Sequence, residues 1–282
     1  MPSGPWPPAP EPLPLPVTDN HTHLDWDGGD DAPSVAEKLA LAWAVGVTQV
    51  VQIGCELDSA RWTAAAVREH PQMVGGVALH PNEAPLHANG THESGVSYEE
   101  AFAEIASLVR GERMRVVGET GLDFFRTGPD GVAAQERSFR DHLALAREVG
   151  LPVQIHDRDA HRRVLEVMDG DGAPPAVVMH CFSGDVEFAR ECLARGWYLS
   201  FAGTVTFTNA PGLREAAAIT PAERLLVETD APFLTPVPHR GRPNSPAQAA
   251  HTVRALAAAR GDDLEALCVV LQTNADRLYG PW

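Results

Sequence analysis

The sequence DNHTHLD, residues 19–25, decides how the rest of the chain is interpreted. It follows a short apolar segment, residues 15–17, and we therefore expect it to end the first β-strand. Side chains alternate between the two faces of a strand, so His21 and His23 point to the same side. Two imidazoles on one face can bind a metal ion. Taken alone, the pair is explained equally well as surface or hydrogen-bonded histidines.

Downstream of this stretch, short apolar segments alternate with amphipathic ones. Further strands are expected at residues 47–53, 73–80, 115–119, 153–156, 176–180, 197–201 and 225–230. Helices are expected at residues 34–45, 58–70, 98–110, 132–149, 160–168, 186–194, 211–219, 246–260 and 262–278. Near-continuous apolar strands separated by helices indicate a parallel sheet covered by helices. Eight repeats in about 250 residues predict a single (β/α)8 TIM-like barrel. An open doubly wound sheet is the alternative, although no G-x-G-x-x-G motif follows the first strand.

Length and composition fit one large α/β domain. The chain has 282 residues, of which 44% are hydrophobic and 21% charged. Residues 1–16 are rich in proline and predict an extended or disordered tail, which leaves residues 17–282 for the barrel. No apolar run is long enough to span a bilayer, and no secretory signal is recognisable. The four cysteines are scattered and have no C-x-x-C spacing, which indicates reduced thiols and a cytoplasmic location.

The formal net charge of −16 excludes proteins that bind nucleic acid through a broad basic surface. Lys38 is the only lysine, so arginine carries nearly all of the positive charge. Bound metal ions and a few local arginines would therefore have to attract a polyanionic substrate.

Polar side chains stand at the ends of the predicted strands. In a barrel, the carboxyl ends of the strands meet at one rim. Six residues able to bind a metal ion would face a common centre there: His21, His23, Glu119, His156, His180 and Asp230. His80 would lie beside them. Glu119 could instead form a structural ion pair, each histidine a hydrogen bond in the core, and Asp230 a helix cap. All of these would have to coincide at five strand ends, which favours a shared metal centre.

Imidazole and carboxylate ligands without thiolate indicate Mg²⁺, Mn²⁺ or Zn²⁺. Six ligands exceed what one ion with open positions needs, so we expect two divalent metal ions. Glu119, central in strand order, is expected to bridge them. Two ions about 3.5–4 Å apart can activate a water molecule and stabilise both the attacking and the leaving oxygen.

These residues, in this order, resemble the TatD family of metal-dependent deoxyribonucleases within the amidohydrolase superfamily. The matching segments are residues 19–25, 78–81 (ALHP), 118–123 (GETGLD), 152–158 (PVQIHDR), 180–184 (HCFSG), 228–234 (ETDAPFL) and 274–280 (NADRLYG). The resemblance implies a TIM-like barrel with two divalent ions. It implies one ion held by His21, His23, Glu119 and Asp230, and another held by Glu119, His156 and His180. It also implies hydrolysis of DNA ends, often 3′→5′, or removal of D-amino acids from tRNA.

We therefore expect a two-metal phosphodiesterase with nucleic acid as its substrate, DNA first and RNA or tRNA as alternatives. Asp230 is expected to act as general base, with Glu119 as the second catalytic carboxylate. His80 and Arg158 are candidates for phosphate contact, although Arg158 could instead pair with a nearby carboxylate. Asp123 is a candidate for substrate contact or for support of the site from behind. Ser245 replaces a glutamate expected from the resemblance, in a loop near the presumed substrate rim.

Two other functions stay open. One is a metal-dependent ester hydrolase such as a D-aminoacyl-tRNA deacylase, in which the same activated water attacks a carbonyl carbon. The other is a metal-bound scaffold that acts through partners contacted by the proline-rich tail. A monomer without membrane attachment is expected in each case.

Overall fold

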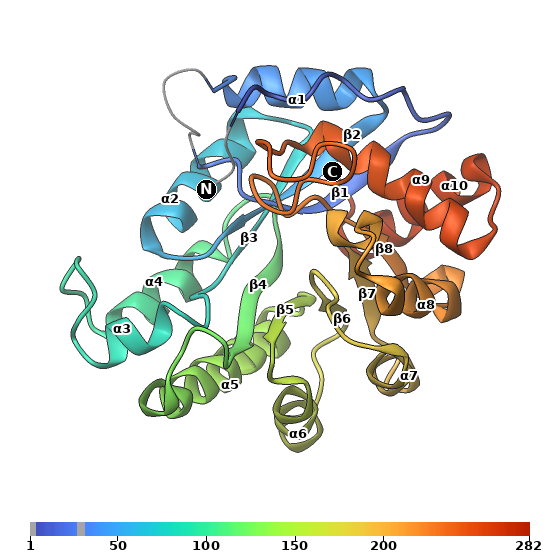
Figure 1. The fold of residues 1–282 in the computed structure, drawn as a ribbon. Helices are drawn as coiled ribbons and strands as arrows, with labels where there is room; N and C mark the ends of the chain where they lie inside the picture. The colour runs from blue at the N-terminus through green and yellow to red at the C-terminus, as the bar shows by residue number, and fades with distance from the viewer. Residues whose placement is uncertain (1–3, 27–31) are drawn as a thin grey trace. The chain divides into compact units, whose positions relative to one another are not determined.

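The computed structural model describes residues 4–26 and 32–282. Eight strands form one sheet in the order β1-β2-β3-β4-β5-β6-β7-β8, with helices between them (Figure 1). This arrangement is the predicted (β/α)8 TIM-like barrel. The strands are β1 (Val17–Thr22), β2 (Val47–Gly54), β3 (Met73–Val77), β4 (Met114–Asp123), β5 (Val153–Arg158), β6 (Val177–Met179), β7 (Tyr198–Phe201) and β8 (Leu225–Val227).

The helices follow the predicted pattern with one addition. They are α1 (Val35–Ala44), α2 (Leu57–Glu69), α3 (Ala84–Ala88), α4 (Tyr98–Leu108), α5 (Val132–Val149), α6 (His161–Asp171), α7 (Val186–Ala194), α8 (Pro211–Ile219), α9 (Ala249–Arg260) and α10 (Leu264–Tyr279). Helix α3 was expected to be loop, but Pro85 in its first turn is compatible with a short helix. Ser34 and Ser97 begin α1 and α4 through capping boxes with the glutamate three residues later.

Contacts divide the chain into two compact units with about four strands each. The first unit comprises Met1–Gln52, His70–Met73 and Cys181–Trp282, and it holds β1, β7, β8 and most of β2. In this unit β1 pairs with β2 and β7 with β8, and the end of β1 lies beside the segment after β8 through a parallel bridge between Thr22 and Ala231.

The second unit comprises Ile53–Glu69 and Val74–His180. Its strands pair in the order β3-β4-β5-β6, all parallel. Helix α5 packs on β4 and α6 on β5, as Figure 1 shows in green and yellow-green. Phe139 and Leu143 of α5 are fully buried at this contact face, as are most side chains of β4. This packing supports the carboxyl ends of β4 and β5.

Residues 4–16 form neither helix nor strand, but they pack on the first unit. Leu13 is buried, and its N–H donates to the carbonyl oxygen of Val45 at 3.0 Å. Arg254 donates to the carbonyl oxygen of Pro12 at 2.9 Å. The expected disorder of the tail therefore does not describe these residues, because neighbouring helices provide partners for carbonyls that proline leaves exposed. Residues 1–3 of the predicted tail lie outside the described residues.

None of the helices in the described part of the chain is both long and apolar enough to cross a membrane. The four cysteines are free thiols, two buried and two half-buried.

Candidate functional site

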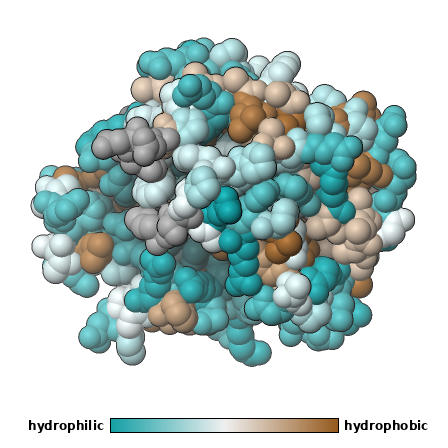
Figure 2. Space-filling view, turned by 45° about the horizontal axis from the view of Figure 1, so that its top comes forward, coloured by the Kyte–Doolittle hydropathy of each residue, from teal (hydrophilic) through white to brown (hydrophobic). Residues whose placement is uncertain are grey.

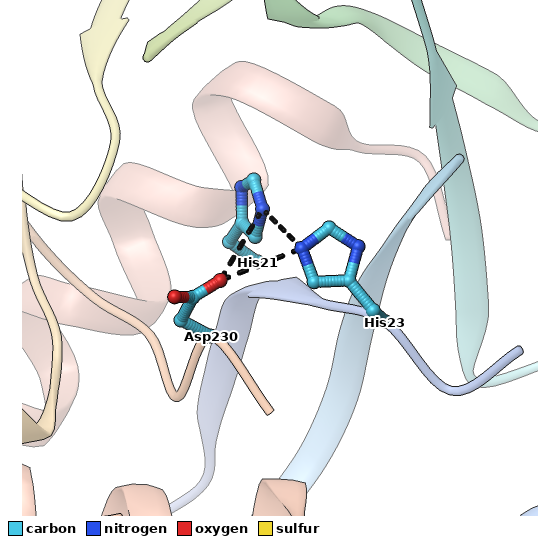
Figure 3. A group of neighbouring side chains, drawn as sticks. All are labelled: His21, His23 and Asp230. Atoms are coloured by element: carbon cyan, nitrogen blue, oxygen red, sulfur yellow. Dashed lines mark hydrogen bonds and ion pairs between the residues drawn. The ribbon is translucent and has the colours of Figure 1, made fainter. Parts of the chain in front are cut away.

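The first unit brings together three of the predicted metal ligands, His21, His23 and Asp230, which we call the first ligand group. Nε2 of His21 lies 3.2 Å from Nε2 of His23. Oδ1 of Asp230 lies 3.9 Å from the first nitrogen and 3.4 Å from the second. Figure 3 shows the three polar ends pointing toward one another. His21 is fully buried, whereas 12% of the His23 side chain and 14% of the Asp230 side chain remain exposed, so solvent reaches the group from one side.

Backbone hydrogen bonds position this group. The N–H of Asp230 donates to the carbonyl oxygen of His21 at 3.0 Å, and the N–H of His23 donates to that of Ala231 at 2.7 Å. From the sequence, Asp230 was expected to be the last residue of the eighth strand. Strand β8 instead ends at Val227, and Asp230 lies in the turn that follows. Its φ of 54° is in the left-handed region, which aspartate tolerates better than most residues. The turn brings its carboxylate back toward the two imidazoles.

Asp19 lies behind the first ligand group and links β1 to the end of β8. Its carboxylate accepts hydrogen bonds from the N–H and hydroxyl of Thr229, at 2.9 and 2.5 Å, and from the N–H of His21 at 3.3 Å. Complete burial raises the pKa of Asp19 to about 8, against the opposing effect of these donors. One buried carboxyl group thus fixes the relative position of the two strands that carry the ligands.

The second unit gathers the other predicted ligands around one carboxylate, and we call Glu119, His80, His156 and His180 the second ligand group. Oε2 of Glu119 lies 2.9 Å from Nε2 of His180 and 3.2 Å from Nδ1 of His156. Oε1 lies 3.6 Å from Nε2 of His80. Glu119 is not at the end of its strand, because β4 continues to Asp123 and pairs with β5 along that extension.

Charge and burial oppose each other in this group. Burial alone would raise the pKa of Glu119, but the imidazoles of His180, His80 and His156 lower it well below its usual value. Burial likewise favours neutral His156, yet hydrogen bonds to Asp123 and Glu119 raise its pKa to about 9. The surroundings therefore favour an ionised Glu119 carboxylate and, at His156, the protonated ring.

Asp123 supports the second ligand group from inside the protein. Its Oδ2 lies 3.4 Å from Nε2 of His156 and accepts a hydrogen bond from Asn82 at 3.1 Å. Its Oδ1 accepts the N–H groups of Phe125 and Arg126 at 3.0 and 2.8 Å. Since Asp123 is buried, these contacts fit its predicted supporting role better than contact with substrate.

Gly121 allows β4 and β5 to approach each other beside His156. Its φ is 143°, a region that residues with a side chain rarely adopt. A Cβ atom at this position would lie 2.1 Å from the carbonyl oxygen of His156. Any larger residue would therefore displace the backbone that carries this histidine.

Arg158, a predicted phosphate contact, ends β5. Its guanidinium carbon lies 3.9 Å from the ring centre of Phe125, and no ion pair recorded among the described residues includes it. The alternative of an ion pair with a nearby carboxylate is therefore not seen. Ser245, expected near the substrate rim, is buried and precedes the short helix Pro246–Gln248, with its N–H bonded to the side chain of Asn244 at 2.9 Å.

Two residues near Glu119 were not predicted as ligands. His80 was assigned to substrate, but its ring nitrogen lies with a carboxylate oxygen of Glu119 and a ring nitrogen of His156 in a set that could hold a metal ion. Cys55 follows β2 directly, and its Sγ lies 3.3 Å from Oε1 of Glu119. Its position immediately after a predicted strand could have indicated a place near the ligands. The scattered spacing of the four cysteines indicated only free thiols.

The donor atoms of each group fit a divalent ion. In the first group, and in the set formed by His80, Glu119 and His156, three nitrogen or oxygen donors lie within 4.8 Å of one another. The two imidazole nitrogens, 3.2 Å apart, and the carboxylate oxygen beside them can each offer a lone pair to one cation. The prediction that all six ligands share one centre concerns both units and stays a prediction.

The chain is similar to several known proteins. Residues 18–280 match the protein family described as TatD related DNase. An uncharacterized metal-dependent hydrolase TatD of Mycobacterium tuberculosis is 44% identical over 266 residues, which cover 93% of this chain and 97% of the relative. A 3′-5′ ssDNA/RNA exonuclease TatD of Cronobacter sakazakii is 35% identical over 86% of this chain and 90% of its own length. The crystal structure of the TatD homologue YJJV from Escherichia coli superposes with a TM-score of 0.81 at 26% identity, covering 94% of this chain and 98% of that one.

Proposed function

Because the chain belongs to the TatD-related DNase family and is a metal-dependent hydrolase, we propose that it cleaves phosphodiester bonds at the 3′ ends of single-stranded nucleic acid, DNA in the first place. The second ligand group carries this proposal, since three imidazoles lie within 3.6 Å of the Glu119 carboxylate. The exonuclease name of the Cronobacter relative supports the substrate class.

We propose that each ligand group holds one divalent ion. The first ion would be bound by His21, His23 and Asp230, and the second by Glu119, His156 and His180, with His80 as a further candidate. The family resemblance also predicts Glu119 as a ligand of the first ion. Divalent ions at these positions would lower the pKa of a bound water and offset negative charge on the phosphoryl oxygens.

The protein side chains would orient the reactants. The Asp230 carboxylate is partly exposed, so one of its oxygens can accept the proton of the attacking water. Glu119 keeps three imidazoles in place and, with its lowered pKa, stays ionised throughout the neutral range. Arg158 provides positive charge for a phosphate close to His156, which offsets the repulsion expected from a net charge of −16.

The proposal is tested with a 5′-labelled single-stranded DNA in the presence of Mg²⁺, Mn²⁺ or Zn²⁺, with a chelator as control. We expect metal-dependent shortening from the 3′ end. Asp230→Asn and His156→Ala should each abolish it while the circular dichroism spectrum stays unchanged. Asp58→Asn is a matched control, because Asp58 is an exposed residue of α2 paired only with Arg61 in the recorded ion pairs of the described residues.

Full activity in either site variant would contradict the assignment. A parallel reaction with D-aminoacyl-tRNA separates the two ester hydrolases. Release of the amino acid without shortening of DNA would replace the nuclease by a deacylase that uses the same ligands. Bound metal without hydrolysis of either substrate would favour the scaffold alternative.

A further inference from the structure

An exposed aromatic ring and an arginine lie directly beyond the second ligand group. Phe125 follows the end of β4 and Arg158 ends β5, two residues after His156. The guanidinium carbon of Arg158 lies 3.9 Å from the ring centre of Phe125. Two residues of a strand span about 7 Å. The backbone of Arg158 therefore lies roughly the length of one nucleotide from the backbone of His156, a predicted metal ligand.

The exposure of Phe125 is unusual for this protein. Hydrophilic residues predominate on the face shown in Figure 2, and hydrophobic ones occur in small separate patches. In the described residues, Phe125 is the most exposed of the large apolar side chains, at 64%. Arg158 covers part of the ring, and the remainder is open to solvent. An exposed ring beside a polar site indicates a binding surface better than a packing role.

The loop that carries the ring is held in place. The N–H of Phe124 donates to the carbonyl oxygen of Arg158 at 2.9 Å. Asp123 accepts the N–H groups of Phe125 and Arg126, and the same carboxylate contacts His156. The ring is thus tied through one buried side chain to the second ligand group. A preorganised surface of this kind loses little entropy when it binds a ligand.

Two arginines that form no ion pair among the described residues accompany the ring: Arg126 follows Phe125 in the sequence, and Arg158 lies against it. The described arginines in recorded ion pairs are Arg61, Arg110, Arg137, Arg140, Arg162, Arg163, Arg190, Arg195 and Arg260. Arg126 and Arg158 are in none of them. Arg126 also lines a cavity of about 330 Å³ together with Asn82, Thr127 and Asp130, beside the loop. An aromatic face flanked by two such cations suits a base with its attached phosphate.

We propose that Phe125 and Arg158 form a stacking platform for one nucleobase of a single-stranded substrate, with Arg126 and Arg158 near the adjoining phosphates. This inference rests on the proposed function and names how the same site recognises its substrate. Stacking on an aromatic ring accepts every base, because every base has a π-face. The platform therefore selects unpaired strands without selecting a sequence.

The test combines protein variants with oligonucleotides that lack a single base. Oligothymidylates with an abasic position at each of the last four nucleotides are compared with the complete strand. Phe125→Ala should raise both the Kd of the oligonucleotide, measured by fluorescence anisotropy, and the KM of the metal-dependent reaction about 5- to 100-fold. The value of kcat should stay within twofold. At one position the missing base should weaken wild-type binding by the same factor, and there Phe125→Ala should cause no further loss.

Three further variants separate stacking from other effects. Phe125→Trp should restore binding, whereas Phe125→Leu, which is apolar but has no ring, should not. Arg158→Ala should weaken binding and reduce the slope of log affinity against log salt by about 0.7. Trp43→Ala is the control, since Trp43 is an exposed aromatic residue of α1 away from both ligand groups in the sequence, and it should leave Kd and KM unchanged.

A change of less than twofold in Phe125→Ala, or an equal loss with every oligonucleotide, would overturn the platform. If DNA is hydrolysed equally well with and without the Phe125 ring, the platform is contradicted but the proposed nuclease activity is not. Conversely, binding that depends on Phe125 and on one base, without hydrolysis of DNA, would support the platform and contradict the nuclease.

Discussion

The two ligand groups are built from the same residue types in different ways. In the first group, two imidazoles face each other and one carboxylate approaches from the turn after β8. In the second, one buried carboxylate lies at the centre, and each imidazole contacts it. Backbone pairing between β1 and the segment after β8 therefore holds the first group together. In the second group, the negative charge of Glu119 holds the three imidazoles.

The two carboxylates are therefore not equivalent. The loss of charge at Asp230 leaves the His21–His23 pair held by its backbone and by Asp19. Loss of charge at Glu119 leaves three imidazoles without the anion that they surround. The second group should therefore depend on a single residue far more than the first.

The strongest test of this comparison is Glu119→Gln beside Asp230→Asn. We expect each to lower kcat/KM at least about 100-fold, more than loss of a supporting partner costs. Glu119→Gln should lose more metal, because glutamine retains the shape of the side chain but not its charge. Metal content by mass spectrometry and kcat/KM on single-stranded DNA are the measurements. Glu99→Gln, at an exposed position of α4, is the matched control.

The stoichiometry of Glu119→Gln also decides the predicted bridge. One ion lost per chain would limit Glu119 to the second group. Two ions lost would agree with the bridge predicted from the family resemblance. Metal content equal to that of Asp230→Asn would remove the distinction between the groups.

The sequence named six of the seven residues in the two groups as ligands and placed His80 beside them, but it did not predict the local backbone that arranges them. Alternation along β1 was sufficient to place His21 and His23 on one side. The position of Asp230 depended on a turn with positive φ, which strand propensity does not reveal. The segment after Glu119 was expected to leave the strand, because threonine, glycine and aspartate favour turns. It stays in β4 because Gly121 permits close pairing with β5, a tertiary effect.

A second test concerns this pairing. Gly121→Ala should lower the free energy of unfolding by at least about 3 kcal/mol, since it combines a backbone clash with an unfavourable φ. Gly128→Ala is the control in the same segment, because its added Cβ would meet no atom within 4 Å. Urea denaturation measures both. Equal stability of the two variants would show that β4 and β5 can separate without cost, and the account of His156 would then be wrong.

The groups also differ in the buried residue behind them. The first rests on Asp19, whereas His142 of α5 lies behind the second. Nε2 of His142 accepts the N–H of Leu79, the residue before His80, at 3.1 Å, and Nδ1 donates to the carbonyl oxygen of Ser138 at 2.7 Å. Complete burial lowers the pKa of His142 from 6.5 to about 4. The neutral ring, with its two hydrogen bonds, therefore stabilises the folded chain.

This pKa predicts how stability changes with pH. The unfolded chain binds a proton at His142 below about pH 6.5, whereas the folded chain does so only near pH 4. The contribution of His142 is thus complete above pH 6.5 and falls between pH 6.5 and 4, by up to about 3 kcal/mol. His142→Gln does not titrate, and its amide oxygen can still accept the N–H of Leu79, so its free energy of unfolding should fall less over this range. The difference between the two proteins, measured by urea denaturation from pH 7 to 4, isolates His142 from the carboxylates that titrate in both. Parallel pH profiles would mean that protonation of His142 does not weaken the fold, and that this ring does not anchor the segment before His80.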